Sequence, residues 1–285
     1  MASYLQVDQK SGKDVAVSIG PLNLCAGKTN GNGHAETVLN VADSEISGAI
    51  KNDDSDGYIH FTAQTSSMLA RIFTGKSRII ESGGIMVISD IDDTIKITNV
   101  RYREMMIANT FFKPFTPVPG MAGLYRNIAR EGALFNYVSA SPWQFYPPLS
   151  DFLKREGFPD GFFHMKYFGL SKNTSNIFAS SDAVKQPYIR ELFQNFPSHT
   201  FVLIGDSGER DPEIYGECAR AWKKRVLGIF IRNVTEENID DVRMKKAFNG
   251  VPSAKCHLFK NAAEIAGDLI QLVRRSQKLK VESRK

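Results

Sequence analysis

The chain has 285 residues, of which 42% are hydrophobic and 24% are charged, and it carries a formal net charge of +5. This composition is typical of a soluble globular protein with a sizeable core, and no apolar stretch approaches the roughly 20 residues that a membrane-spanning helix requires. The basic excess favours anionic partners, such as phospholipid surfaces, phosphorylated substrates or nucleic acid, without choosing among them.

Residues 1–6 show neither the pattern of a secretory signal nor the glycine that myristoylation needs. The three cysteines, Cys25, Cys218 and Cys256, are scattered and odd in number, which favours reduced thiols over disulfides or a thiolate metal site. We therefore expect a cytoplasmic protein.

Residues 1–83 contain short segments of alternating polarity at 14–18, 58–61 and 77–80, separated by polar loops. Such alternation predicts strands, so we expect a small β-rich, sandwich-like module. The loops at 29–33 and 52–57 are rich in glycine, asparagine and aspartate, which are typical of turns.

Two near-motifs lie in these loops. Gly27-Lys28-Thr29 resembles the end of a phosphate-binding P-loop, but Gly20 stands too far upstream and no strand-to-helix context surrounds it. The segment 52–57 resembles a calcium loop, but Ala63 stands where a bidentate glutamate is needed. We expect ordinary turns in both places.

From residue 84 to about 275, short apolar runs alternate with amphipathic stretches, which predicts βα units in a Rossmann-like parallel sheet. The expected strands are 85–89, 134–138, 201–204, 227–231 and a last one at 257–259. The expected helices are 123–130, 149–155, 187–196 with Pro187 in the first turn, 213–223 and 261–274. Residues 276–285 form a basic tail.

Polar clusters follow the predicted strands, where open α/β sheets place their ligand crevice. Asp90 and Asp92 leave the first strand, so one carboxylate can attack phosphorus while the other gives a proton to the leaving oxygen. A carboxylate that attacks a phosphate needs a cation beside it, and magnesium suits oxygen ligands. Taken alone, an Asp-x-Asp pair also occurs in turns and helix caps.

Three further clusters continue the pattern, and each has an ordinary structural alternative. Ser139 and the residues after it, through Trp143, could hold phosphate oxygens or cap a helix. Lys185, near the start of a predicted helix, could balance phosphoryl charge or be solvated. The segment 205–211 could supply metal carboxylates or form a turn. The order of all four clusters resembles the haloacid dehalogenase-like phosphatase superfamily.

A closer resemblance, to the catalytic domain of the yeast actin patch protein phosphatidate phosphatases, extends over residues 84–235. It is carried by 87–96 (VISDIDDTIK), 109–111 (NTF), 117–121 (PVPGM), 137–144 (YVSASPWQ) and 205–213 (GDSGERDPE). The resemblance implies a haloacid dehalogenase-like fold. The segment between Thr94 and Leu134 is too short for a large cap domain, so we expect none.

Roles in catalysis also follow from the resemblance. Asp90 would form the aspartyl-phosphate and Asp92 would protonate the leaving alcohol and then activate water. The other residues expected at the site are Thr94 as catalytic, Ser139 and Lys185 as catalytic and substrate-binding, and Asp93 and Ala140 as substrate-binding. Magnesium would be bound by Asp90, the main-chain carbonyl of Asp92, and Asp206, with Asp211 in support. Lys166 is the alternative to Lys185 in the lysine role.

The function expected from this resemblance is magnesium-dependent hydrolysis of phosphatidate to diacylglycerol and phosphate by a peripheral membrane enzyme. The alternatives are hydrolysis of a soluble or protein phosphomonoester, and a non-catalytic phosphatidate-sensing module, which would not need the nucleophile Asp90. No motif indicates nucleic-acid binding.

Two segments suggest contact with an anionic membrane. One is 105–115 with Trp143, Phe145 and Tyr146, whose apolar side chains could either dip into a membrane interface or pack in the core. The other is the C-terminal basic cluster, which could also be a solvated helix end. Its members are Arg274, Arg275, Lys278, Lys280, Arg284 and Lys285.

Overall fold

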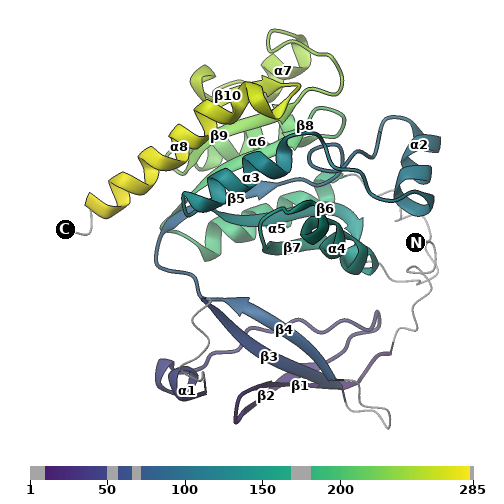
Figure 1. Cartoon of the computed structure of the whole chain (residues 1–285), viewed down its shortest axis with the longest axis vertical. Helices are drawn as coiled ribbons and strands as arrows, with labels where there is room; N and C mark the ends of the chain where they lie inside the picture. Colours follow the sequence, from purple (N-terminus) through teal and green to yellow (C-terminus); the bar gives the residue numbers. More distant parts are fainter. Residues whose placement is uncertain (1–9, 50–56, 66–71, 168–180, 283–285) are drawn as a thin grey trace. The chain divides into compact units, whose positions relative to one another are not determined.

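The structure of the chain is a computed structural model that describes residues 10–49, 57–65, 72–167 and 181–282 (Figure 1). The chain divides into two compact units. One consists mainly of Gln6–Glu81, and the other mainly of Ser82–Tyr167 and Ser175–Lys285. Most of the calcium-loop-like segment, 52–56, and the last two basic residues, 284 and 285, lie outside the described residues.

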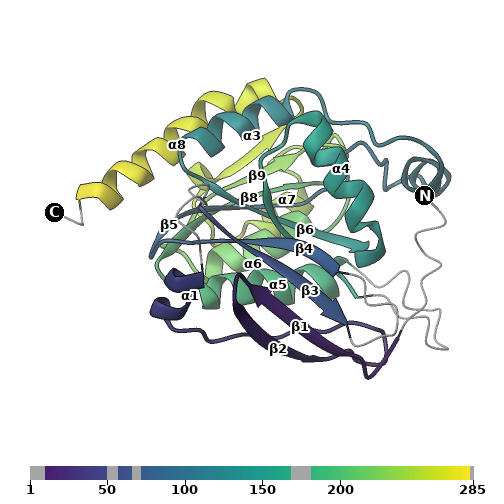
Figure 2. The same ribbon diagram turned by 60° about the horizontal axis from the view of Figure 1, so that its bottom comes forward.

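The first unit contains a four-stranded antiparallel sheet with the order β2-β1-β3-β4 (Figures 1 and 2). Its elements are β1 (Asp14–Ile19), β2 (Leu22–Lys28), α1 (Asp43–Ala49), β3 (Tyr58–Thr65) and β4 (Ile72–Arg78). The strands expected near 14–18 and 58–61 are present, whereas the last strand begins five residues before the expected 77–80. Strand β2 is not predicted, and it pairs with β1 across a turn at Gly20, whose φ is 53°. The described strands form one sheet, not the two sheets of a sandwich.

The second unit contains a six-stranded parallel sheet with the order β10-β9-β8-β5-β6-β7, which confirms the expected α/β class. The central strands are almost fully buried because helices cover both faces of the sheet. The strands are β5 (Gly84–Ser89), β6 (Leu134–Pro142), β7 (Gly161–Lys166), β8 (His199–Asp206), β9 (Val226–Arg232) and β10 (Cys256–Phe259).

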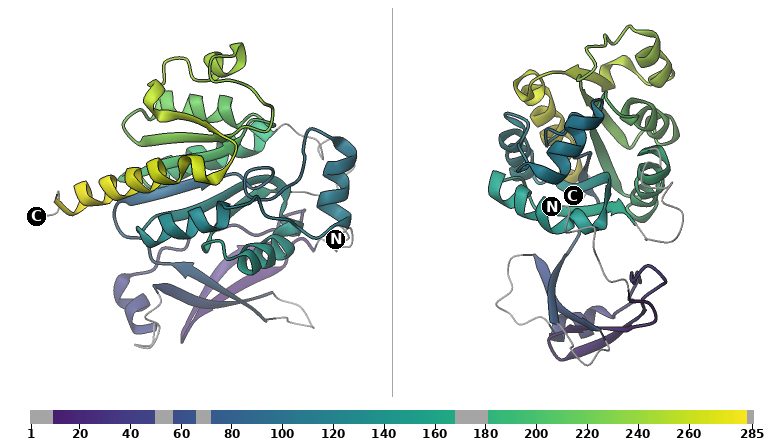
Figure 3. Two further views of the ribbon diagram at one scale, coloured as in Figure 1. Left: turned by 45° about the horizontal axis from the view of Figure 1, so that its top comes forward. Right: turned by 90° about the vertical axis from the view of Figure 1, so that its right-hand side faces the viewer.

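Helices α3, α4 and α8 lie on one face of this sheet, and α5 and α6 lie on the other (Figure 3). The connection after β5 contains only two short segments and α3, so no large cap is inserted there. None of the described helices is both long enough and apolar enough to span a bilayer. The helices are α2 (Arg103–Ile107), the π-helical η2 (Ala108–Phe112), α3 (Met121–Arg130), η3 (Trp143–Phe145), α4 (Tyr146–Glu156), α5 (Ser181–Asn195), α6 (Asp211–Ala221), α7 (Val242–Ala247), η5 (Ser253–Lys255) and α8 (Ala262–Glu282).

Three features of this unit differ from the sequence predictions. Pro187 does not open a helix but lies inside α5, which begins at Ser181. Strand β7 is not predicted, and its Gly161 is packed so closely that an added Cβ would lie 2.6 Å from the Tyr137 ring. The last helix continues past Arg274 to Glu282, so the described part of the basic tail is helical.

His164 on β7 is a buried histidine that we expect to link stability to pH. Its Nε2 lies 3.2 Å from Asn136 Oδ1, its ring lies 5.5 Å from that of Tyr188, and burial lowers the pKa of His164 to about 4. In the unfolded chain the pKa of a histidine is near 6.5, so the unfolded state takes up this proton first as pH falls. The stability from this source is therefore complete above pH 6.5 and is lost as pH falls towards 4.

We predict that this loss amounts to about 3 kcal/mol in the free energy of unfolding. The measurement is urea unfolding between pH 7 and pH 4, followed by tryptophan fluorescence. Both tryptophans, Trp143 and Trp222, lie in the α/β unit. His164→Gln should flatten the pH dependence relative to wild type. Parallel curves for the two proteins would contradict the prediction.

Candidate active site

The predicted polar clusters meet at the carboxyl end of the parallel sheet. Strand β5 pairs with β6 on one side and with β8 on the other, so the residues that follow these three strands become neighbours. Asp90 follows β5 directly, Ser139 lies near the end of β6, and Asp206 is the last residue of β8. The sheet order therefore brings together side chains that are more than 110 residues apart.

Lys185 is the centre of the charge arrangement. Its side chain comes from α5 and is fully buried, and its Nζ lies 2.7 Å from Asp90 Oδ1, 2.7 Å from Asp211 Oδ1 and 2.8 Å from Glu209 Oε2. Because Pro187 lies inside α5, Lys185 stands in the second turn of the helix instead of ahead of it. The lysine in contact with Asp90 is thus Lys185, whereas Lys166 ends β7, two strands away from β5.

The pKa values reflect this crowding of charge. Burial raises the pKa of Asp90 well above its ordinary value, and although the Lys185 ammonium lowers it, the neighbouring carboxylates of Asp211, Glu209 and Asp206 raise it further. Burial lowers the pKa of Lys185, but the surrounding carboxylates outweigh burial and raise that pKa well above its ordinary value. The ammonium therefore remains charged, while the acids around it, when ionised, carry more negative charge than one lysine can balance.

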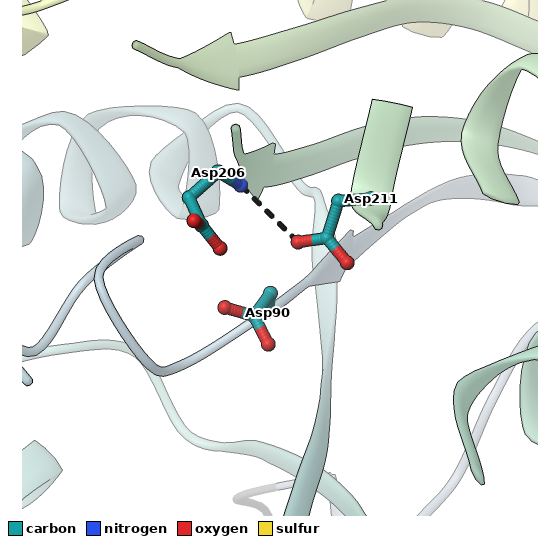
Figure 4. Close-up of side chains that lie close together, drawn as sticks. All are labelled: Asp90, Asp206 and Asp211. Atoms are coloured by element: carbon teal, nitrogen blue, oxygen red, sulfur yellow. Dashed lines mark hydrogen bonds between the residues drawn. The ribbon is translucent and has the colours of Figure 1, made fainter. Parts of the chain in front are cut away.

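Asp90, Asp206 and Asp211 form a buried cluster in which one carboxylate oxygen from each residue lies within 4.8 Å of the others (Figure 4). Asp211 Oδ2 accepts a hydrogen bond from the main-chain nitrogen of Asp206 at 3.1 Å, and Asp206 Oδ1 accepts one from Gly208 at 2.6 Å. Among the described residues, the buried Asp206 Oδ2 has no hydrogen-bond partner. Three buried carboxylates with one uncommitted oxygen fit a hard divalent cation such as magnesium.

Arg243 on α7 holds the loop that follows β8. Its guanidinium donates to the carbonyl oxygens of Ser207 at 2.6 Å and Glu209 at 2.5 Å, and it pairs with Glu213 at 2.8 Å. These bonds fix the turn that presents Asp206 and Asp211. Arg243 lies about 30 residues beyond the loop and outside the quoted motifs, so the sequence does not identify it.

Asp92 has a different environment from Asp90. Its Oδ1 lies 2.7 Å from Lys96 Nζ and accepts a hydrogen bond from the Thr98 hydroxyl at 2.6 Å. Its Oδ2 accepts bonds from the Ser139 hydroxyl at 3.3 Å and the Ser141 hydroxyl at 3.2 Å. Burial raises the pKa of Asp92, but Lys96 and Thr98 together bring the pKa below its ordinary value, so the group is ionised.

Asp93 and Thr94 shape the loop that follows these two acids. Asp93 has a φ of 53°, and its carboxylate accepts hydrogen bonds from the main-chain nitrogens of Thr98, Asn99 and Val100 at 2.7–2.8 Å. Thr94 Oγ1 donates to Asp90 Oδ2 at 3.0 Å. The Asp93 side chain is thus committed to the backbone of the loop.

Sequence reasoning assigns no role to Lys96 or Thr98, and it includes Ser141 and Glu209 only as members of the segments 139–143 and 205–211. All lie within or next to the quoted motifs, and Lys96 is four residues after Asp92, but the sequence does not show which way their side chains point. Ala140 lies in β6 between the two serines. Of the aromatic residues for which both membrane contact and core packing were open, Phe145 is 2% exposed and packs in the core, whereas Tyr146 is 41% exposed.

Residues 85–233 match the family described as "Phosphatidate phosphatase APP1, catalytic domain". The match covers about half of the chain. The chain belongs to this family. The resemblance to this catalytic domain that the sequence motifs indicate is therefore confirmed.

Two curated relatives share this region. An uncharacterized protein of Schizosaccharomyces pombe is 32% identical over 163 residues, which are 56% of this chain and 27% of that protein. Phosphatidate phosphatase APP1 of Saccharomyces cerevisiae is 34% identical over 153 residues, which are 52% of this chain and 26% of that protein. The match thus spans about a quarter of each relative. Among solved structures, D,D-heptose 1,7-bisphosphate phosphatase of B. bronchiseptica is 11% identical, with a TM-score of 0.39 over 66% of this chain and 98% of that one.

We predict that Asp93→Ala destabilises the α/β unit by about 3 kcal/mol, because three main-chain N–H groups lose a charged acceptor. Urea unfolding followed by tryptophan fluorescence measures the change. The matched control is Asp240→Ala, since the Asp240 side chain is 83% exposed and pairs with Lys245 at 3.3 Å. The control should change stability by less than about 0.5 kcal/mol. Equal stability of Asp93→Ala and the control would refute the role given to Asp93.

Proposed function

We propose that this chain is a magnesium-dependent phosphatase that hydrolyses phosphatidate to diacylglycerol and phosphate, as a cytoplasmic enzyme bound peripherally to a membrane. The observation that carries this proposal is that Asp90 and Asp92, two residues apart, are paired with different lysines, Lys185 and Lys96. Two carboxylates in unlike environments can take different roles, one as nucleophile and the other as acid and base. Membership of the catalytic-domain family supports phosphatidate as the substrate.

The reaction would have two steps. In the first, a carboxylate oxygen of Asp90 bonds to phosphorus while the bond from phosphorus to the alcohol oxygen breaks, and Asp92 gives that oxygen its proton. In the second, water attacks the phosphorus of the aspartyl-phosphate while Asp92 takes a proton from the water. The bond from phosphorus to the Asp90 oxygen breaks, phosphate leaves and the Asp90 carboxylate is restored. Lys185 and the Ser139 hydroxyl would hold the phosphoryl oxygens, and Thr94 orients the carboxylate of Asp90.

Asp92 must change its protonation between these steps. Lys96 and Thr98 hold the pKa of Asp92 below its ordinary value, which favours the carboxylate, the form that activates water. Negative charge raises the pKa of a nearby carboxyl group, so a bound phosphate would favour the protonated form that the first step needs. The same residue can thus serve as acid when substrate is present and as base after the alcohol has left.

Magnesium would be held by Asp90, the main-chain carbonyl of Asp92, and Asp206, with Asp211 in support. When bound, the ion would offset the repulsion between the attacking carboxylate and the phosphate. The surplus of carboxylates over Lys185, and the uncommitted Asp206 Oδ2, support this assignment.

Exposed apolar side chains support a substrate that is embedded in a membrane. Tyr102, Met105 and Phe112, in the connection after β5, are 61%, 47% and 75% exposed, and Tyr146 follows β6. These connections leave the same edge of the sheet at which the acids lie. Aromatic and long apolar side chains at such an edge suit the interface between water and lipid.

We predict that wild type releases phosphate from phosphatidate in mixed micelles with magnesium and not with EDTA. Asp90→Asn should lower the rate by about 10³-fold or more, because the nucleophile is removed. Asp151→Asn is the matched control, since Asp151 is exposed on α4 and should leave the rate unchanged. A soluble phosphomonoester hydrolysed faster than phosphatidate would support the alternative substrate. Binding of the micelles without phosphate release would support a sensing module.

We also predict that magnesium raises the melting temperature of the protein without any substrate. At a concentration 100 times its Kd, an ion that binds only the folded state adds about 2.7 kcal/mol of stability. Asp206→Asn should remove most of this shift, and Asp240→Asn should retain it. The assignment fails if magnesium raises the melting temperature of Asp206→Asn as much as that of wild type.

A further inference from the structure

The buried lysine Lys96 is not explained by core packing. Its side chain is 2% exposed, and its Nζ lies 2.7 Å from Asp92 Oδ1, 2.5 Å from the Thr98 hydroxyl and 4.8 Å from the centre of the Phe115 ring. An apolar side chain of similar length would fill the same space without the cost of burying an ammonium group, and a buried ion pair is weak evidence for a gain in stability. The ammonium is directed at one oxygen of the acid/base residue, which indicates a role in the reaction.

The two oxygens of Asp92 are held differently. Oδ1 has two short bonds, one to Lys96 and one to Thr98 at 2.6 Å, and Thr98 itself is buried. Oδ2 has two longer bonds, to the hydroxyls of Ser139 at 3.3 Å and Ser141 at 3.2 Å. Substrate or water can replace the bonds to Oδ2 more easily than those to Oδ1, so Oδ2 is the oxygen available for proton transfer.

The backbone of the same loop fixes Lys96 and Thr98. The Lys96 carbonyl accepts a hydrogen bond from Asp93 N at 2.7 Å, Lys96 N donates to the Ile91 carbonyl at 3.0 Å, and Thr98 N donates to Asp93. Lys96, Thr98 and the Asp92 that they bind thus belong to one hydrogen-bonded turn. Lys96 cannot drift away from Asp92 unless this turn opens.

We propose that Lys96, together with Thr98, is a positioning residue that ties down Asp92 Oδ1 so that Oδ2 faces the leaving alcohol and later the attacking water. This inference rests on the proposed function and adds a residue to it. Asp92 donates its proton through Oδ2 as the bond between phosphorus and the alcohol oxygen breaks, and a neutral alcohol leaves. Lys96 does not touch the reacting atoms.

The test compares two substrates that differ in their need for this proton. A short-chain phosphatidate has an alkoxide leaving group that requires protonation, whereas p-nitrophenyl phosphate releases a stable phenolate. The quantity compared is kcat/KM, which reports the steps up to the transfer of phosphate to Asp90 and excludes the later attack of water. The proteins compared are wild type, Lys96→Met, Thr98→Val, Asp92→Asn, the double variant of Lys96→Met with Asp92→Asn, and a control.

We expect Lys96→Met to lower kcat/KM for the phosphatidate by about 100-fold and for p-nitrophenyl phosphate by less than about fivefold. Asp92→Asn should show the same selectivity, and the double variant should be no worse than Asp92→Asn, because both changes remove one function. Thr98→Val should have a smaller effect in the same direction. The control is Lys255→Met, whose ammonium bonds the carbonyls of Lys223 and Val226, and it should not change the ratio between substrates.

Equal losses on both substrates, or no loss on the phosphatidate, would overturn the inference. If the wild type hydrolyses neither substrate, the proposed function fails by itself, and the crystal structure of Lys96→Met still decides the positioning role. In that structure we expect Asp92 Oδ1 to leave Thr98 and the side chain to occupy more than one rotamer. An Asp92 carboxylate that stays in place without Lys96 would also overturn the inference. If Lys96→Met does not fold, the double variant is compared with Asp92→Asn instead, because it contains no carboxylate at position 92 that has lost its partner.

Discussion

The burial of Lys185 among the carboxylates of Asp90, Asp211 and Glu209 is the constraint on which the rest of the α/β unit depends. Taking these charges out of water is costly, and only close contacts of opposite sign can offset the cost. The fold provides such contacts by placing β5 beside β8. Lys185, in the second turn of α5, then contacts Asp90 after β5 and Asp211 after β8. Arg243 from α7 then fixes the loop after β8, which contains Glu209 and leads to Asp211, two of the partners of Lys185.

The separation of Asp90 from Asp92 follows from the same arrangement. Asp90 shares Lys185 with two other acids, and the negative charge around it exceeds what one lysine can neutralise. Asp92 is the one acid that pairs with Lys96 among the described ion pairs, and its pKa is lowered, whereas that of Asp90 is raised. Asp93 holds the backbone of residues 98–100, and Thr98 in this stretch donates to Asp92. These unlike surroundings support the different roles that we propose for the two carboxylates.

The errors of sequence prediction have physical causes. Proline is common in the first turn of a helix, so Pro187 suggests a start there, but contacts of α5 with β6 and β7 hold the helix together around it. For Phe145 and Tyr146 the sequence left both core packing and an exposed position open, and the structure buries Phe145 and leaves Tyr146 exposed. Strand β7 lies at the edge of the sheet and most of its residues are only half-buried, so it does not have the continuous apolar run of a central strand.

The sequence by itself determined the parallel α/β unit, the order of its motifs and the family. Apolar runs and short motifs are local patterns, so they can be recognised from the order of residues alone. It also placed Asp90, Asp92, Ser139, Lys185, Asp206 and Asp211 at the ends or starts of elements that share one edge. Only the tertiary structure decided that Lys185 and not Lys166 contacts Asp90, that Glu209 joins them, and that Lys96 and Thr98 hold Asp92. These facts depend on helix placement and side-chain direction, which are set by packing between segments far apart in the chain and leave no periodic signal in it.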